Sequence, residues 1–286
     1  MAKLGYDNLP TLAVWQIDSY VSLSADQRLA ATQKIESVQA WHRKTQIPDY
    51  VELLRSIQGQ VAAGPVTEQQ VRQWRLDVTA RWRPLAEQAA PGVVEVAQTL
   101  QPEQLARMRG ELERGNDKLR REWLPAGPDK RIEARAKRYI ERAEFFLGDV
   151  TDEQKRLARQ MAVDAPDGEE AWMGRRVARQ QEFVRLLEKV RLQPPGSPEA
   201  TRAMREHLVR YWTTDESSAR AAQAPVTFLR AAHAHAQAAP ALTLEQSMAH
   251  GDAVTAAMLS RATPAQRKVL QGKLQDWIDT LQLIAR

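Results

Sequence analysis

Apolar side chains recur along most of the chain at spacings of three and four residues, the period of one buried face of an α-helix. The clearest stretch spans residues 128–148. Its apolar residues fall on one stripe: Ile132, Ala136, Tyr139, Ile140, Ala143, Phe146 and Leu147. No stretch shows the strict polar–apolar alternation that is typical of a β-strand. The pattern predicts an all-α protein, a multi-helix bundle of short antiparallel helices.

Prolines divide this pattern into segments. The predicted helices cover residues 8–21, 24–46, 48–63, 67–88, 91–99, 101–123, 128–147, 151–163, 167–191, 197–213, 217–238, 243–260 and 263–284. Pro48 is expected to separate two of them, because proline is tolerated in the first turn of a helix but not in its interior. Pro84 is expected to kink or end the helix that begins near Thr67. We expect one helical domain over residues 1–286, or two packed halves that meet near residues 124–128.

One short motif marks several of these helix starts. An apolar residue, a Ser or Thr and, three positions later, a Gln occur at residues 23–27, 66–70, 150–154, 242–246 and 262–266, with a degenerate copy at 100–104. The hydroxyl can accept a hydrogen bond from a first-turn amide while the Gln side chain accepts one from the amide of the Ser or Thr. The motif therefore predicts capped helix starts, and a role in binding is the alternative.

Composition narrows the possible functions. The 286 residues include 41 Lys and Arg against 36 Asp and Glu, a net charge of +5. The two signs are interleaved along the predicted helices, whereas nucleic-acid binding favours basic residues gathered on one stripe, so we expect no nucleic-acid partner. The chain has no cysteine, which excludes disulfides, thiol nucleophiles and Cys-ligated zinc. It also has no run of apolar residues long enough to span a membrane.

Sequence motifs for catalysis are missing as well. The chain has no Gly-rich phosphate loop, no His-Glu-x-x-His and no Gly-x-Ser-x-Gly. His233 and His235 stand two apart on a predicted helix, so they point in different directions and cannot face one metal ion. We expect neither a metal nor a cofactor.

Two segments carry more functional groups than a helix surface requires. The first is residues 41–50, where Pro48 is expected to form a corner between two helices. The candidate binding residues there are Trp41, His42, Arg43, Asp49 and Tyr50. We expect the two aromatic side chains to pack across the corner and the carboxylate to hold the arginine or the histidine. The segment is interpreted either as a structural corner or as a recognition site.

The second segment is residues 137–148, an amphipathic helix that ends at Gly148, a residue suited to a helix C-cap. Phe145 falls off the buried stripe there and is expected to contact a neighbouring helix or a ligand.

These two segments, together with residues 3–10, resemble a family of proteobacterial helical lipoproteins of unknown function. The resemblance implies a cell-envelope protein with a leader and a lipidated cysteine just before Leu4. That cysteine is not part of this chain, so membrane attachment is expected only through a lipid anchor outside it. The implied location is the periplasm, with anchoring to the outer membrane. Residues 242–246 also resemble the Leu-Thr-x-x-Gln motif of the Spy/CpxP periplasmic chaperones.

Taken together, the sequence predicts a non-enzymatic envelope protein that acts as an interaction or chaperone-like module. Its expected partner is another envelope protein or an unfolded polypeptide. The alternative is an envelope hydrolase that uses His42 and Asp49, although no nucleophile is recognisable beside them.

Overall fold

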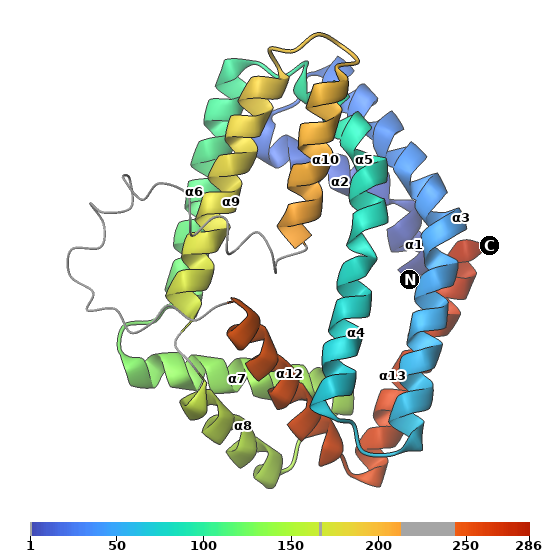
Figure 1. The fold of residues 1–286 in the computed structure, drawn as a ribbon, viewed down its shortest axis with the longest axis vertical. Helices are drawn as coiled ribbons and strands as arrows, with labels where there is room; N and C mark the ends of the chain where they lie inside the picture. Colours follow the sequence, from blue (N-terminus) through green and yellow to red (C-terminus); the bar gives the residue numbers. More distant parts are fainter. Residues whose placement is uncertain (1, 166–167, 213–243) are drawn as a thin grey trace.

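The computed structural model describes residues 2–165, 168–212 and 244–286, and within these ranges the ordered elements are all α-helices (Figure 1). The helices are α1 (Ala2–Asp7), α2 (Leu9–Val21), α3 (Ala25–Ala63), α4 (Glu68–Ala80), α5 (Trp82–Ala97), α6 (Pro102–Trp123), α7 (Pro128–Leu147), α8 (Asp152–Asp164), α9 (Glu169–Val190), α10 (Pro198–Trp212), α12 (Leu244–Ser260) and α13 (Pro264–Ala285). The predicted all-α class is confirmed. The helix predicted over residues 217–238 lies outside the described ranges.

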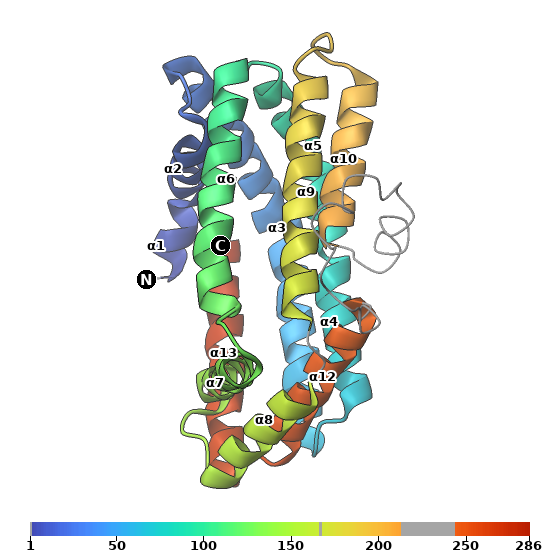
Figure 2. The ribbon, with the colours of Figure 1, turned by 90° about the vertical axis from the view of Figure 1, so that its left-hand side faces the viewer.

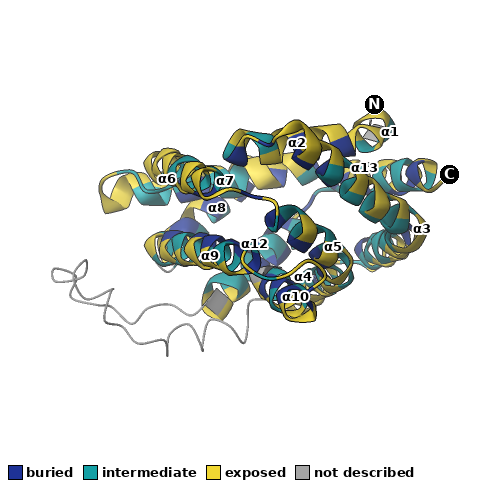
Figure 3. Cartoon of the chain, turned by 90° about the horizontal axis from the view of Figure 1, so that it is seen from above, coloured by how far each residue is buried: buried dark blue, intermediate teal, exposed yellow. Residues whose placement is uncertain are grey.

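The long helices run roughly parallel to the longest axis of the molecule. Helix α3 packs against α13 along one edge, and α4 and α5 follow one another as a nearly continuous rod beside them (Figures 1 and 2). Helices α6, α9 and α10 occupy one end, while α7, α8 and α12 pack together at the other. Seen from above, α2 and α6 lie on one side, and α5, α9 and α10 lie on the other (Figure 3).

Buried apolar residues form separate clusters along this axis. The first joins α2, α3, α5, α6, α9 and α10, and the second joins the end of α3 to α4, α7, α12 and α13. A third, smaller cluster lies between α7, α8 and α12. None of the described helices combines the length and the apolar character needed to cross a membrane.

The prolines that were expected to separate or break helices behave differently. The boundary expected before Pro91 is wrong, because α5 runs through this residue from Trp82 to Ala97. The expected boundary at Pro48 is wrong, because α3 continues through it from Ala25 to Ala63. Proline costs the helix one hydrogen bond, but Ile47 and Val51 on either side of it are buried, and this packing holds the helix together. The expectation for Pro84 is confirmed, since α4 ends at Ala80 and Pro84 falls in the first turn of α5.

Capping boxes begin several helices, as the repeated motif predicts. In each box the Ser or Thr hydroxyl accepts a hydrogen bond from the backbone of the Gln, and the Gln side chain accepts one from the backbone of the Ser or Thr. The capping residues are Ser24, Thr67, Thr151 and Thr263. In the degenerate copy, the backbone N–H of Gln101 donates to Oε1 of Gln104 at 2.8 Å. Thr243 lies outside the described residues.

The end of α7 also follows the sequence. Gly148 has a φ of +75° and its N–H donates to the carbonyl of Glu144 at 2.9 Å, so the predicted glycine C-cap is confirmed. Phe145 does contact a neighbouring helix, because its ring stacks on that of Trp277 in α13 with the centroids 6.1 Å apart.

A buried ion pair that the sequence did not reveal ties α7 to α8 and α9. Arg135 is buried and donates to both carboxylate oxygens of Glu169, at 2.8 and 2.6 Å. It also donates to the carbonyls of Ala162 and Ala165 at the end of α8. Burial opposes ionisation of Glu169, but the hydrogen bonds and charge of Arg135 outweigh it and keep the pKa of Glu169 below its usual value.

Candidate functional site

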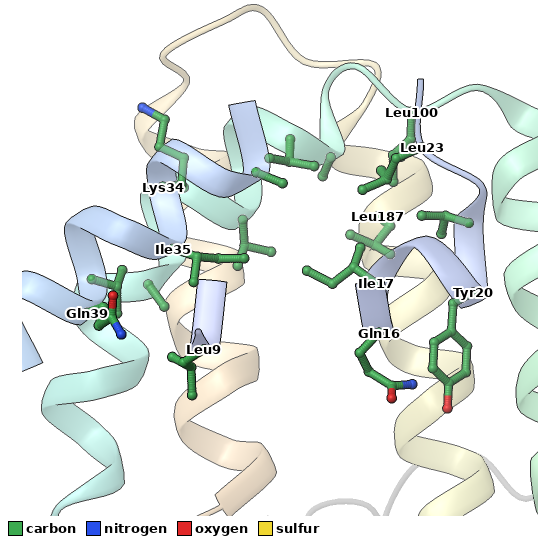
Figure 4. A pocket seen from close by; sticks show the side chains of 18 of the residues that line it. Leu9, Gln16, Ile17, Tyr20, Leu23, Lys34, Ile35, Gln39, Leu100 and Leu187 are labelled. Carbon is green, nitrogen blue, oxygen red and sulfur yellow. The ribbon is translucent and has the colours of Figure 1, made fainter. Parts of the chain in front are cut away.

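A cavity of about 560 Å³ lies inside the first apolar cluster, between α2, α3 and α5 (Figure 4). Helices α6 and α9 close it with Met108, Phe183 and Leu187. Most of its lining is aliphatic or aromatic: Leu9, Ile17, Tyr20, Val21, Leu23, Ala31, Ile35, Val38, Leu85, Ala89, Val93, Val96, Ala97 and Leu100. The volume is within the ~300–1,000 Å³ that is usual for small-molecule sites.

The α3 wall follows directly from helix geometry. Residues 31, 34, 35, 38, 39 and 42 line the cavity, and their spacing of three and four places them on one face of α3. On the opposite wall, Gly92 lets α5 approach closely. A Cβ at this position would lie 3.0 Å from Cβ of Lys34 and 3.3 Å from its Cγ. The glycine therefore sets the spacing between these two walls.

Charge is almost absent from the wall. Of the described residues that line the cavity, Lys34 is the one Lys, Arg, Asp or Glu. Its ammonium group is 2.5 Å from a carboxylate oxygen of Glu95, which is not a lining residue. Its carbon stem faces Gly92. Even the charged residue thus contributes hydrocarbon to the cavity.

The mouth of the cavity lies along α2. The lining residues Leu9, Gln16 and Ile17 are exposed to solvent, whereas Leu23 and Leu100 are buried. Figure 4 shows the two buried leucines together at one end of the cavity, and Leu9 and Gln16 toward the other.

Helix α1 is fastened to α3 beside this mouth. Pro10 has no N–H to donate to the carbonyl of Tyr6 four residues earlier, and the side-chain amide of Gln39 donates to that carbonyl instead. The Tyr6 hydroxyl lies 3.0 Å from Nδ1 of His42 and donates to the carbonyl of Gln39 at 3.2 Å. Arg43 donates to Asp7 at 2.6 Å.

Burial affects both members of the Tyr6–His42 pair. It lowers the pKa of His42 and raises the pKa of Tyr6, because each charged form loses solvation. Both rings therefore carry no charge at neutral pH, and their ring centroids lie 5.9 Å apart in a stacked arrangement. They extend the uncharged wall of the cavity to α1.

The residues predicted at the supposed corner take different places. His42 lines the cavity and meets the edge of the Tyr50 ring, with the centroids 5.3 Å apart. Trp41, Arg43, Asp49 and Tyr50 are not part of the lining. Trp41 is half-buried on α3.

The expected contact of Asp49 with Arg43 or His42 is wrong. Asp49 instead pairs with Arg81, which donates from Nη2 at 2.9 Å and places Nε 2.8 Å from the second carboxylate oxygen. The reason is that α3 does not turn at Pro48. Seven residues of continuous helix place Asp49 about 10 Å along the axis from His42.

Metal ligands do not gather anywhere in the described ranges, where no three His, Asp or Glu side chains come together around a common point.

The chain was compared with known protein families. Residues 19–216 match the model of DUF6279, a family of unknown function. The chain belongs to the DUF6279 family. No curated protein and no solved structure matches it. The match includes the α3, α5, α6 and α9 walls of the cavity, whereas α1 and most of α2 precede residue 19. Most of the cavity wall therefore belongs to the part of the chain that matches the DUF6279 model.

Sequence reasoning found His42 but missed the cavity. The other walls come from segments in which the sequence indicated helices and no site, and neither Tyr6 nor Gln39 was singled out. One signal was present in α2, where apolar residues occupy more of the circumference than one buried stripe requires: Leu9, Leu12, Val14, Trp15, Ile17, Tyr20 and Val21. A helix that is apolar on several faces needs more than one apolar neighbour.

Proposed function

We propose that this DUF6279 protein is a non-enzymatic binding module that takes an alkyl chain of an amphipathic molecule into the cavity between α2, α3 and α5. The observation that carries the proposal is a cavity of about 560 Å³ with an almost entirely hydrocarbon wall. Water has few hydrogen-bond partners in such a space, so an apolar ligand is favoured over solvent.

The wall favours an alkyl chain over a polypeptide segment. Every peptide unit brings a donor and an acceptor that need partners when they are buried. The side chains of Gln39 and Tyr6 already hold α1 against α3. An alkyl chain makes no such demand, and its polar head can remain in water at the mouth beside Leu9 and Gln16.

The proposed setting is the cell envelope, as the resemblance to proteobacterial lipoproteins implies. Envelope lipids would supply molecules with alkyl chains there. The chaperone-like role suggested by the Spy/CpxP motif and the hydrolase that uses His42 and Asp49 are the competing functions. The engagement of Asp49 with Arg81 argues against the second of these.

Ligand titration tests the proposal. The full chain is titrated with a fluorescent fatty-acid analogue, and unlabelled fatty acid and lysophospholipid serve as competitors. We expect saturable binding that unlabelled chains reverse, together with a rise in the unfolding temperature. Ala89→Phe, which fills the cavity from α5, should abolish binding. Gln88→Phe adds the same ring one residue away on the exposed surface and should leave binding intact.

Two other outcomes would replace the proposal. Suppression of aggregation of an unfolding client, unaffected by alkyl competitors and by Ala89→Phe, would favour the chaperone-like role. Hydrolysis of a model ester that disappears in His42→Ala and Asp49→Ala would favour the enzyme.

A further inference from the structure

Helices α1 and α2 present an exposed apolar stripe whose residues do not line the cavity. The helical hydrogen bonds continue across the junction, from Asn8 N–H to Leu4 and from Leu12 N–H to Asn8, both at 3.1 Å. Leu4, Asn8, Leu12 and Trp15 therefore follow one another at spacings of four, four and three residues. We call these four residues the outer stripe. Its three apolar members are exposed to solvent: Leu4 by 66%, Leu12 by 56% and Trp15 by 68%.

No ionised group interrupts the outer stripe. The charged residues of α1 and α2 are Lys3, Asp7 and Asp18. Lys3 donates to the carbonyl of Leu283, and Asp7 pairs with Arg43. Asp18 accepts from the backbone of Leu23 and pairs with Arg28 at 3.1 Å. Each of the three is engaged with the rest of the chain, and the positions beside the stripe hold uncharged polar residues such as Thr11 and Ser19.

We propose that the outer stripe lies in the interfacial region of a lipid bilayer. An exposed tryptophan between leucines suits that region, because the indole ring is apolar while its N–H can bond to headgroups. Burial of this apolar area supplies the binding free energy. Since the stripe carries no charge, the attraction does not depend on anionic lipids.

The size of the stripe argues against a second copy of the chain as the occupant. A stable protein interface buries ~800 Å² on each partner. The stripe offers two leucines and one tryptophan, and even a fully buried aromatic side chain contributes at most ~250 Å². A bilayer requires no minimum area, and a small apolar surface gives weak, reversible attachment that a second anchor can reinforce.

A neighbouring face of α2 lines the cavity through Leu9, Ile17 and Tyr20. The docked α2 would therefore bring the cavity close to the bilayer. The docking proposal rests on the outer stripe alone and does not require that the cavity bind an alkyl chain.

Vesicle flotation tests the docking. The full chain is mixed with vesicles of zwitterionic phosphatidylcholine, with and without added anionic phosphatidylglycerol, at low and at high salt. We expect the chain to float with both kinds of vesicle and to do so equally at both salt concentrations. Subtracting the fluorescence spectrum of Trp15→Phe from that of the wild type gives the emission of Trp15. The maximum of this emission should shift to shorter wavelength when vesicles are added.

Variants locate the contact. Leu12→Glu and Trp15→Glu change exposed side chains and should each lower the vesicle partition coefficient about tenfold or more. Leu192→Glu, at a position that is 77% exposed between α9 and α10, is the matched control and should float like the wild type.

Three results would overturn the docking proposal: no flotation of the wild type, equal loss in all three glutamate variants, or a dimer in sedimentation that Leu12→Glu dissociates. Cavity binding is read separately, by titration without vesicles, in which the Leu12→Glu variant should bind the fatty-acid analogue normally. The flotation and titration experiments can therefore fail independently of each other.

Discussion

The side-chain amides of Gln154 and Gln266 exchange two hydrogen bonds, although the residues are 112 positions apart. Nε2 of Gln154 donates to Oε1 of Gln266 at 2.9 Å, and Nε2 of Gln266 donates to Oε1 of Gln154 at 2.8 Å. The same Oε1 atoms also accept from the backbone N–H groups of Thr151 and Thr263, which completes both capping boxes. Two helix starts are thus joined to each other through the residues that cap them.

A second pair repeats this arrangement at the other end of the molecule. Gln27 and Gln104 exchange amide hydrogen bonds at 3.1 and 2.8 Å. In both pairs each Gln also donates to the backbone carbonyl two residues before its partner's cap. Those carbonyls belong to Ser22, Thr99, Asp149 and Arg261. The repeated motif therefore caps helices and also joins helix pairs.

This pairing explains why the motif ends in Gln. A capping box accepts Glu as well as Gln, but only an amide can both accept from the cap and donate to a partner. Gln154→Glu should keep the box and lose the donor. Because the site is buried, we expect a loss of at least about 1–3 kcal/mol in the free energy of unfolding, measured by urea denaturation.

Gln70→Glu is the control for that substitution. Gln70 completes the box of Thr67, but its amide is 3.4 Å from Gln60, at the limit of a hydrogen bond. A small effect is expected there. Equal losses in the two variants would mean that the boxes, and not the amide exchange, account for the stability.

The cap itself can be tested at Thr151. Its hydroxyl accepts from the N–H of Gln154 at 3.2 Å. Thr151→Ala should lower the free energy of unfolding by about 0.5–2 kcal/mol, while Thr151→Ser, which keeps the hydroxyl, should change it little. Ligand binding in the cavity should be the same in both variants, because Thr151 is not part of the lining. Full stability of Thr151→Ala together with lost binding would show that the motif acts in recognition.

Local signals in the sequence were sufficient for the fold class and for several of the helix ends. The apolar stripe of α7, the boxes at Ser24 and Thr67, and the C-cap at Gly148 each depend on residues within a few positions of one another. The continuation of α3 through Pro48 did not follow from local rules. It depends on the burial of Ile47 and Val51 by distant helices, which outweighs the local cost of the proline.

The cavity could not be predicted for the same reason. Its walls come from α2, α3 and α5, and the space between them depends on the small residue at Gly92 facing Lys34. Likewise, the pairing of Arg135 with Glu169 and of Gln27 with Gln104 connects positions tens of residues apart. The sequence showed that His42 stands in a dense segment, but it did not show which side of α3 faces a cavity.

Gly92 gives a prediction about packing. In an ordinary helix interior, Gly→Ala stabilises by about 0.5–1 kcal/mol. Gly59→Ala in α3 should show this gain, because nothing lies within 4 Å of the added Cβ. Gly92→Ala should instead destabilise, since its Cβ would meet Cβ of Lys34 at 3.0 Å and force α3 and α5 apart. The two variants are compared by urea denaturation, and an equal gain in both would show that the α3–α5 spacing is not fixed by this glycine.

His207 gives a prediction about pH. It is buried, and its ring stacks on that of Phe183 with the centroids 5.3 Å apart. Burial lowers the pKa of His207 below its usual 6.5, and the nearby carboxylate of Glu182 offsets this only in part. The folded state therefore binds the proton less readily than the unfolded state. The stability that comes from the neutral ring is complete above pH 6.5 and is lost as the pH falls toward the folded-state value.

Replacing this histidine should flatten the acid side of the stability profile. His207→Phe keeps an aromatic ring against Phe183 but cannot be protonated. Its free energy of unfolding should therefore fall less than that of the wild type between neutral pH and the region below 6.5. Well above pH 6.5 the ring of the wild type is neutral, so a difference measured there reports packing alone and serves as the reference. Parallel profiles for the two proteins would show that protonation of His207 does not limit stability in acid, and the burial of this imidazole would then have no energetic consequence in that range.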